Sequence, residues 1–214
     1  MVLHSAFAFT IRVVLLMSVR GYHLPYLLLA LLCLVLAWLP EPLQQLLQYQ
    51  RDAIGQGQLW RLLTGHLLHS NNWHLLMNLA GLLLAMLLHG SYYRGKMLTL
   101  QWLLCGLAIS LALYYYSPQI HIYVGLSGLL HSMLTLGALR DIHLKMLTGW
   151  LLLAGLLVKV SVEQWQGPDA QLAQLIDASV AIDAHLYGVI AGLAIGLAAA
   201  IMQRYNTKPS TDAS

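Results

Sequence analysis

The chain has 214 residues, of which 59% are hydrophobic and only 9% are charged. This composition, with a mean hydropathy of +0.68, is typical of a polytopic membrane protein and excludes a soluble globular domain. The formal net charge of +3 comes from scattered residues without a basic stripe, so we expect no nucleic acid partner. Cys33 and Cys105 lie in long apolar runs, where thiols pack as small groups and predict neither a disulfide framework nor a metal site.

The role of the first 23 residues is left open by the sequence. An apolar stretch is interrupted by Arg12 and followed by Arg20. It is either a cytoplasmic or interfacial helix, or an overextended start with Met17 as the true initiator. We therefore divide the chain into this N-terminal segment (1–23), a membrane domain (24–203) and a polar cytoplasmic tail (204–214).

Six apolar segments follow, and each is interpreted as a membrane-spanning helix at about 20 residues per crossing. They lie near residues 24–39, 73–89, 97–116, 127–139, 146–161 and 184–202. The fourth is too short to cross alone, because residues 127–139 rise only about 20 Å. Its missing length must come from residues 117–126, and irregular backbone at that depth is tolerated only where it is buried or lines a wet cavity. The sequence thus predicts an all-α polytopic membrane protein, a six-transmembrane-helix bundle with a short fourth helix.

Charge is distributed unequally between the two sides of this predicted bundle. Six crossings place both termini on one side, together with eight of the eleven basic residues: Arg12, Arg20, Arg94, Lys96, Arg140, Lys145, Arg204 and Lys208. The positive-inside rule makes that side cytoplasmic. The outer loops hold six of the eight acidic residues, including Glu163 in the loop 162–183. The sequence does not decide whether this loop caps a site or contacts a substrate.

A serine between glycines opens the fourth span, in Gly125-Leu126-Ser127-Gly128. A serine hydroxyl is a poor nucleophile until a base takes its proton, so this motif alone fits an ordinary helix cap better than an active site. His185, near the outer end of the sixth span, is a candidate base, although viewed singly it also fits a packing interface. Glycines follow it at helical spacing and would let another helix approach closely: Gly188, Gly192 and Gly196.

His74 and Asn78 lie four residues apart on the second span and share one helix face. Both can donate hydrogen bonds to a developing oxyanion, and each such donor can lower a barrier by about 2.7–4 kcal/mol. An interhelical polar contact would produce the same pair. His66 and His69 also invite a metal or haem site with His74, but no acidic or cysteine ligand lies nearby, and interfacial hydrogen bonding explains them as well.

In combination, these motifs resemble those of the rhomboid intramembrane serine proteases. The family shares a Trp-Arg in the first outer loop, a His-x-x-x-Asn in the second span, a Gly-x-Ser-Gly opening a short fourth span, and an Ala-His-x-x-Gly-x-x-x-Gly in the sixth. The chain matches them in order and placement with Trp60-Arg61, His74 and Asn78, Gly125 to Gly128, and Ala184-His185 through Gly188 and Gly192. The similarity covers roughly residues 58–197. Each motif alone is common, but the four together in this order are specific for the family.

The resemblance implies a role for each matching residue. Ser127 is expected to be the nucleophile and His185 its general base and then acid, with His74, Asn78 and the Ser127 backbone amide as the oxyanion site. No triad aspartate is expected. His69 is expected to be structural, and Arg61 to hold the first loop. A substrate's transmembrane segment would enter laterally, unwind near the outer leaflet and be cleaved through an acyl-enzyme.

One position departs from the family pattern. Four residues after the nucleophile, where members often have a tyrosine stacked on the catalytic imidazole, this chain has His131. The imidazole either fills the same space or adds a titratable group that couples to His185.

A narrower resemblance is to the rhombosortases, carried by the run from Trp60 to His69 and by Gly-Leu-Ser-Gly-Leu-Leu-His around Ser127. It implies a bacterial cytoplasmic (inner) membrane, with the site opening to the extracytoplasmic side. The expected substrates are exported proteins with a C-terminal Gly-Gly tag. Whether water or an amine resolves the acyl-enzyme is open.

Two other classes of function remain. A non-catalytic rhomboid-like protein would bind membrane segments or assist their export, but such proteins usually lack the nucleophile or the base. A histidine-ligated metal or haem protein is prompted by ten histidines, five of which lie near predicted span ends, where they need no cofactor. The favoured interpretation is a protease without cofactor or metal, whose partners are a membrane-anchored protein substrate and the lipid bilayer.

Overall fold

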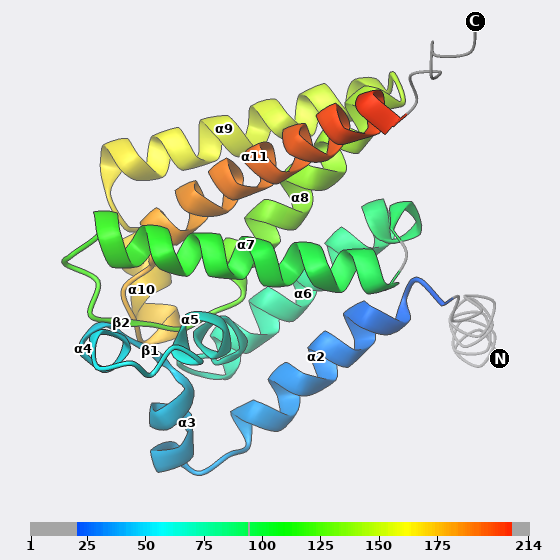
Figure 1. Cartoon of the computed structure of the whole chain (residues 1–214). Helices are drawn as coiled ribbons and strands as arrows, with labels where there is room; N and C mark the ends of the chain where they lie inside the picture. The colour runs from blue at the N-terminus through cyan, green and yellow to red at the C-terminus, as the bar shows by residue number, and fades with distance from the viewer. Residues whose placement is uncertain (1–20, 94, 207–214) are drawn as a thin grey trace, which may run out of the picture.

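The computed structural model describes residues 21–93 and 95–206 (Figure 1). The expectations for residues 1–20, including Met17 as initiator, and for the tail beyond residue 206 lie outside the described residues. The main helices of the described chain correspond to the predicted spans: α2 (Leu24–Ala37), α6 (Asn72–His89), α7 (Gly95–Tyr116), α8 (Ser127–His143), α9 (Leu147–Gln166) and α11 (Ile182–Asn206).

The number of membrane crossings follows only in part from these helices. Among the described residues, α6, α7, α9 and α11 are the four helices long and apolar enough to cross a membrane. The others are shorter, 14 residues for α2 and 17 for α8. The protein is therefore a helical multi-pass membrane protein, and the count of six crossings stays a prediction. α8 does exceed the predicted segment 127–139, because it continues to His143 with Asp141 buried against the Tyr92 hydroxyl.

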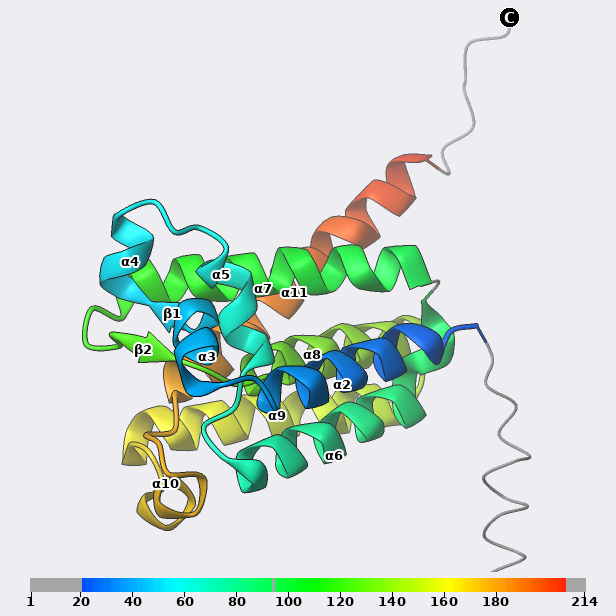
Figure 2. The ribbon, with the colours of Figure 1, turned by 90° about the horizontal axis from the view of Figure 1, so that it is seen from below.

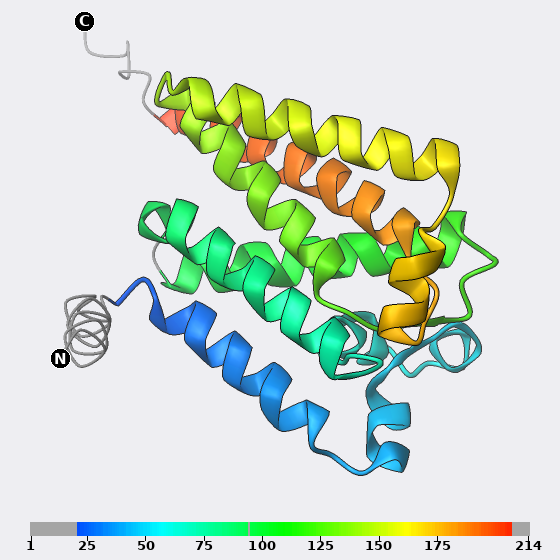
Figure 3. The same cartoon turned by 180° about the vertical axis from the view of Figure 1, so that it is seen from behind.

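The bundle encloses polar side chains within a largely apolar core, and its outer faces are apolar. α8 lies at its centre and packs against α6, α7, α9 and α11 (Figures 1 and 3). Ser132 and Thr135 of α8 are fully buried, and their hydroxyls donate to carbonyl oxygens of the same helix. Large side chains such as Leu28, Leu84 and Leu151 are 50–65% exposed on the outer faces of α2, α6 and α9, where a bilayer would cover them.

Glycines bring α8 and α11 into backbone contact. A Cβ atom added at Gly192 would lie 2.8 Å from the Cβ of Thr135 and 2.9 Å from the carbonyl oxygen of Ser132. One added at Gly128 would lie 3.0 Å from the carbonyl oxygen of Ala184, and one at Gly188 would overlap the carbonyl oxygen of Gly128. Small residues permit such close approach of helices in a membrane. The contact therefore brings together the first turns of α8 and α11.

The long connection between α2 and α6 is folded and attached to the segment that precedes α8. It contains α3 (Glu41–Leu47), α4 (Arg51–Gly55), α5 (Arg61–Thr64) and the 3-10 turn η1 (Gly65–Leu67). Its strand β1 (Tyr49–Gln50) pairs antiparallel with β2 (Ile122–Tyr123), a small sheet that the sequence did not predict. The buried Arg61 stabilises the connection, because its Nη1 donates to the carbonyl oxygens of Gln45 and Gln48, both at 2.7 Å.

The connection and the outer loop 162–183 gather at one end of the bundle. Figure 2 shows α3, α4, α5 and α10 (Ala170–Ile176) at this end, whereas the start of α2 and the end of α11 lie at the other. Two side chains before α6 hold α10 in place: Ser70 Oγ donates to the carbonyl oxygen of Ile176, and Asn71 Nδ2 donates to that of Leu175. The loop is thus fastened over the N-terminal end of α6.

Candidate active site

Ser127 is the first residue of α8 and follows a sharp backbone turn at Gly125. Gly125 has φ of +128°, a conformation that L side chains rarely adopt. A Cβ atom there would also lie 2.8 Å from Nε2 of His74, so both backbone and space require glycine. The Gly125 N–H donates to the carbonyl oxygen of Gly65 at 3.2 Å, and the Tyr123 hydroxyl donates to that of Gly125 at 2.7 Å. These bonds fix the position at which Ser127 enters α8.

Ser127 and His185 are in direct contact across the α8–α11 interface. Oγ of Ser127 lies 2.9 Å from Nε2 of His185. This distance lies within the range of about 2.6–3.2 Å expected for a nucleophile and its base. His185 is in the first turn of α11 and is 6% exposed, so its imidazole is shielded from bulk water. The structure thus brings together the two residues that the separate motifs singled out.

Behind His185 lies a carboxylate that the sequence analysis missed. Glu163, near the end of α9, has its two carboxylate oxygens 3.0 and 3.1 Å from Nδ1 of His185. It is also paired with Lys159, one helical turn earlier. The available signal was a single acidic residue at the end of an apolar helix, four residues after a lysine. It was assigned to the outer loop because the predicted span ended at Ser161.

His131 stacks on one face of the His185 ring. The ring centroids are 4.3 Å apart and the planes differ by 16°. Its Nδ1 donates to the Ser127 carbonyl oxygen at 2.7 Å, which fixes the ring in place. His131, Glu163 and His185 form a group of possible metal ligands. Near-parallel rings, however, direct their lone pairs side by side and not to one point, and Lys159 already lies against the carboxylate. The geometry favours a stacked pair over a tetrahedral metal site.

His74 and Asn78 extend from α6 towards the turn that precedes Ser127. Both are buried, and a Cβ atom at Gly125 would lie 2.8 Å from Nε2 of His74 and 3.7 Å from Nδ2 of Asn78. Within the described part of the chain, Nδ2 of Asn78 has no hydrogen-bond partner. An unpaired buried donor costs about 1–3 kcal/mol, so this amide is available to an oxygen that arrives with a substrate.

The hydrogen-bonding state of His74 depends on the outer loop. Its Nδ1 lies 3.0 Å from Oγ of Ser70, whose only hydrogen is donated to the carbonyl oxygen of Ile176. Ser70 Oγ must therefore accept from His74 Nδ1–H, which leaves Nε2 of the neutral ring as an acceptor. The Ser70 N–H lies 3.5 Å from Nδ1, too long to compete. The oxyanion role of His74 stays a prediction: in this hydrogen-bonding arrangement its Nε2 is an acceptor, and it becomes a donor when the Ser70–Ile176 bond opens.

The other residues that the sequence singled out lie around the site. His69 is buried edge-to-face against His74, with centroids 5.1 Å apart, and burial lowers its pKa to about 3. His66 is bonded through Nδ1 to the Tyr123 hydroxyl and through Nε2 to the Ser110 hydroxyl, so it does not join His69 and His74 in a ligand set. Trp60 is half exposed, and its Nε1 donates to the carbonyl oxygen of Leu46.

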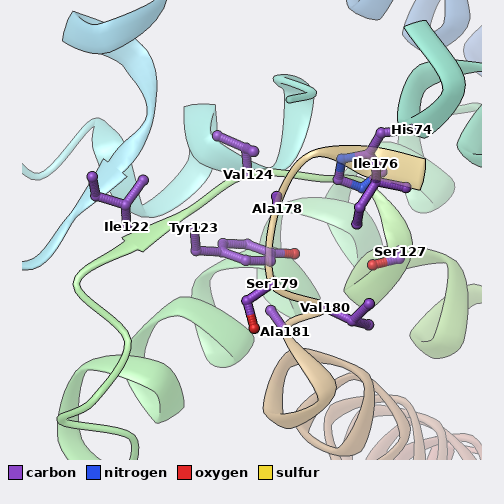
Figure 4. A pocket seen from close by; sticks show the side chains of 10 residues that line it. All are labelled: His74, Ile122, Tyr123, Val124, Ser127, Ile176, Ala178, Ser179, Val180 and Ala181. Carbon is purple, nitrogen blue, oxygen red and sulfur yellow. The ribbon is translucent and has the colours of Figure 1, made fainter. Parts of the chain in front are cut away.

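A cavity of about 260 Å³ opens onto Ser127 and His74 (Figure 4). One wall is the β2 segment, residues 122–124, and the other is the chain that follows α10, residues 176–181. The side chains of these walls are mostly small or branched apolar groups. The outer loop that the sequence left undecided therefore lines the site directly.

Comparison with known families agrees with these observations. The Rhomboid domain model matches residues 56–201, more than half of the chain and all four motif segments. A search of curated proteins found no match. The chain therefore belongs to the rhomboid family, whose members are intramembrane serine proteases that act on membrane proteins within the bilayer.

Proposed function

We propose that the protein is an active intramembrane serine protease in which Ser127 is the nucleophile and His185 is the general base. The observation that supports this most directly is the 2.9 Å contact between Ser127 Oγ and His185 Nε2. A histidine that served only packing would need no hydroxyl at this nitrogen. Nδ2 of Asn78, which has no partner in the part of the chain that the structure describes, lies beside the same turn and supplies the second requirement of acyl transfer, a donor for the oxyanion.

The reaction uses these groups in a fixed order. Ser127 Oγ attacks the scissile carbonyl carbon while its proton passes to Nε2 of His185. The resulting oxyanion is stabilised by Asn78 Nδ2, by the Ser127 N–H and, once its Nε2 carries a proton, by His74. Cleavage of the C–N bond transfers the proton from His185 to the leaving amine and leaves an ester on Ser127. Water or an amine then attacks this ester, with His185 again acting as base.

The substrate class in this proposal is that of the rhombosortase branch. The cavity of about 260 Å³ is bordered by Val124, Ala178 and Val180, which leave room for small residues at the scissile bond. A Gly-Gly pair fits such a space, and glycines unwind a helix readily. The proposed setting is a bacterial inner membrane, with six crossings, both termini cytoplasmic, the site facing outwards, and residues 24–203 as the membrane domain.

Co-expression with an exported protein that carries a C-terminal Gly-Gly tag and a membrane span tests the proposal. We expect the wild type to shorten this substrate, and Ser127→Ala and His185→Ala to leave it intact, as measured by intact mass spectrometry. The mass of the product separates hydrolysis from transfer to an amine. Ser127-dependent labelling by a fluorophosphonate without cleavage would retain the protease but reject this substrate, whereas no labelling would favour the non-catalytic alternative.

A further inference from the structure

We propose that Glu163 is the positioning residue for His185, so that the site works as a Ser127–His185–Glu163 triad. The inference rests on the proposed protease function. It goes beyond the family resemblance, which implies a serine and a histidine without an acidic third member. The three groups come from α8, α11 and α9, which meet at the end of the bundle that holds the cavity.

The carboxylate selects the tautomer that catalysis needs. Both oxygens of Glu163 lie within hydrogen-bond distance of Nδ1 of His185, at 3.0 and 3.1 Å. An ionised carboxylate only accepts hydrogen bonds, so Nδ1 carries the hydrogen and Nε2 presents its lone pair to the Ser127 hydroxyl. Without an acceptor at Nδ1, the neutral ring is free to place its hydrogen on Nε2, and that form cannot take a proton from Ser127.

The surroundings of Glu163 keep it in the ionised, accepting form. Lys159 of the same helix is ion-paired with Oε1, while the other oxygen remains directed at His185. The charged or titratable groups around His185 are His131, stacked on its face from α8, His74 across the site on α6, and Asp183, two residues earlier in α11. Asp183 is occupied by bonds from Ser117 and Gln119. Glu163 is therefore the carboxylate that faces the imidazole.

The same carboxylate stabilises the charge that develops during the reaction. When His185 accepts the Ser127 proton, the ring becomes an imidazolium whose positive charge lies about 3 Å from Glu163. In a site shielded from water this attraction is stronger than in solution. His131 covers one face of the ring and His185 is only 6% exposed, so the imidazolium has little access to water. Loss of the acidic member of a soluble Ser-His-Asp protease lowers kcat by about 10⁴-fold through the tautomer effect.

If Glu163 only held α9 and α11 together, its substitution would lower stability; if it positions His185, its substitution lowers the reaction rate. We expect Glu163→Gln to reduce the rate of fluorophosphonate labelling at Ser127 by at least about 100-fold with an unchanged thermal unfolding midpoint. Glu163→Asp, which restores a carboxylate at shorter reach, should recover part of the rate. Glu41→Gln is the matched control, because Glu41 is an exposed residue of α3, a helix that lies away from α11 (Figure 1), and it should label like the wild type.

Nitrogen NMR of histidine-labelled protein gives a readout that does not depend on activity. His185, assigned by comparison with His185→Asn, should show a single Nδ1–H tautomer in the wild type and a mixture in Glu163→Ala. Wild-type labelling rates in Glu163→Gln, or an unchanged tautomer in Glu163→Ala, would overturn the positioning role. A wild type that shows the Nδ1–H tautomer but is never labelled at Ser127 would instead reject the protease function while leaving the Glu163–His185 contact established.

Discussion

Replacing Gly192 by alanine tests whether the α8–α11 contact sets the geometry of the dyad. Carbon atoms in ordinary contact lie about 3.5–4.0 Å apart, whereas the added Cβ would lie 2.8 Å from the Cβ of Thr135. It would also lie 2.9 Å from the carbonyl oxygen of Ser132. Neither atom can be moved by a rotamer change, because both are fixed to the α8 backbone. The helices must therefore separate locally by about 0.7–1.2 Å.

The displacement reaches the reacting atoms. Gly192 lies seven residues from His185, or about 10 Å along α11. If half of the helix separation at Gly192 reaches the first turns of α8 and α11, the distance between Ser127 Oγ and His185 Nε2 increases from 2.9 Å to the limit of hydrogen-bond range or beyond it. Since a misplacement of about 1 Å costs about 100-fold in rate, we expect Gly192→Ala to slow labelling of Ser127 by about 10- to 100-fold.

The assay is the second-order rate constant for fluorophosphonate labelling of purified protein in detergent, with the unfolding midpoint measured in parallel. Gly155→Ala on α9 is the matched control, because a Cβ atom there would meet nothing within 4 Å. We expect this variant to label at the wild-type rate. Equal rates for the two variants at equal folded fraction would refute the link between glycine packing and dyad geometry.

Three further predictions follow from single contacts. Asn78→Ala should lower kcat for substrate cleavage by about 100- to 1,000-fold without lowering the unfolding midpoint, because its Nδ2 has no partner to lose among residues 21–93 and 95–206; a clear fall in the unfolding midpoint would contradict its assignment to the oxyanion. Ser70→Ala, which frees Nδ1 of His74 and unfastens α10, should label faster than the wild type, and slower labelling would reject the role of this bond in restraining the site. Burial lowers the pKa of His66 from 6.5 to about 4, so the unfolded chain takes up a proton first as pH falls. The contribution of His66 to the free energy of unfolding is complete above pH 6.5 and declines by about 3 kcal/mol towards pH 4. We expect the fall in thermal stability between these pH values to be smaller in His66→Gln than in the wild type.

Hydropathy predicted the existence of the helices well and their ends less well. All six predicted segments begin within two residues of the observed helices, because apolar runs of this length have few other interpretations in a membrane. The predicted ends fall where polar residues begin. α8 continues past Leu139 because Asp141 is satisfied by Tyr92 and Thr148, a contact across the bundle that no local pattern contains.

The same effect hid Glu163. The predicted span ended at Ser161, whereas α9 continues to Gln166 and stops before Gly167, which has φ of +83°. The extra turn and a half carries the glutamate to His185, 22 residues later in the chain. The small sheet β1–β2 and the helix α10 were also missed, since each is stabilised by partners distant in sequence. Motifs indicated the serine, the histidines and the asparagine, but the groups that orient them come from tertiary contacts.

The effect of a substitution on this site should depend on helix spacing more than on distance from Ser127. Glycine contacts hold α8 against both of these neighbours, for example Gly192 on the α11 side and Gly149 on the α9 side, where an added Cβ atom would lie 2.6 Å from the carbonyl oxygen of Ala138. The first contact sets the separation of the serine and the histidine, and the second sets the position of α9, which holds Glu163. Gly149 lies about 20 Å along α9 from Glu163, yet a side chain there must tilt or shift the whole rigid helix. Gly149→Ala should therefore weaken the Glu163–His185 contact and reduce labelling, whereas Gly155→Ala, which is nearer to Glu163 in sequence, should not.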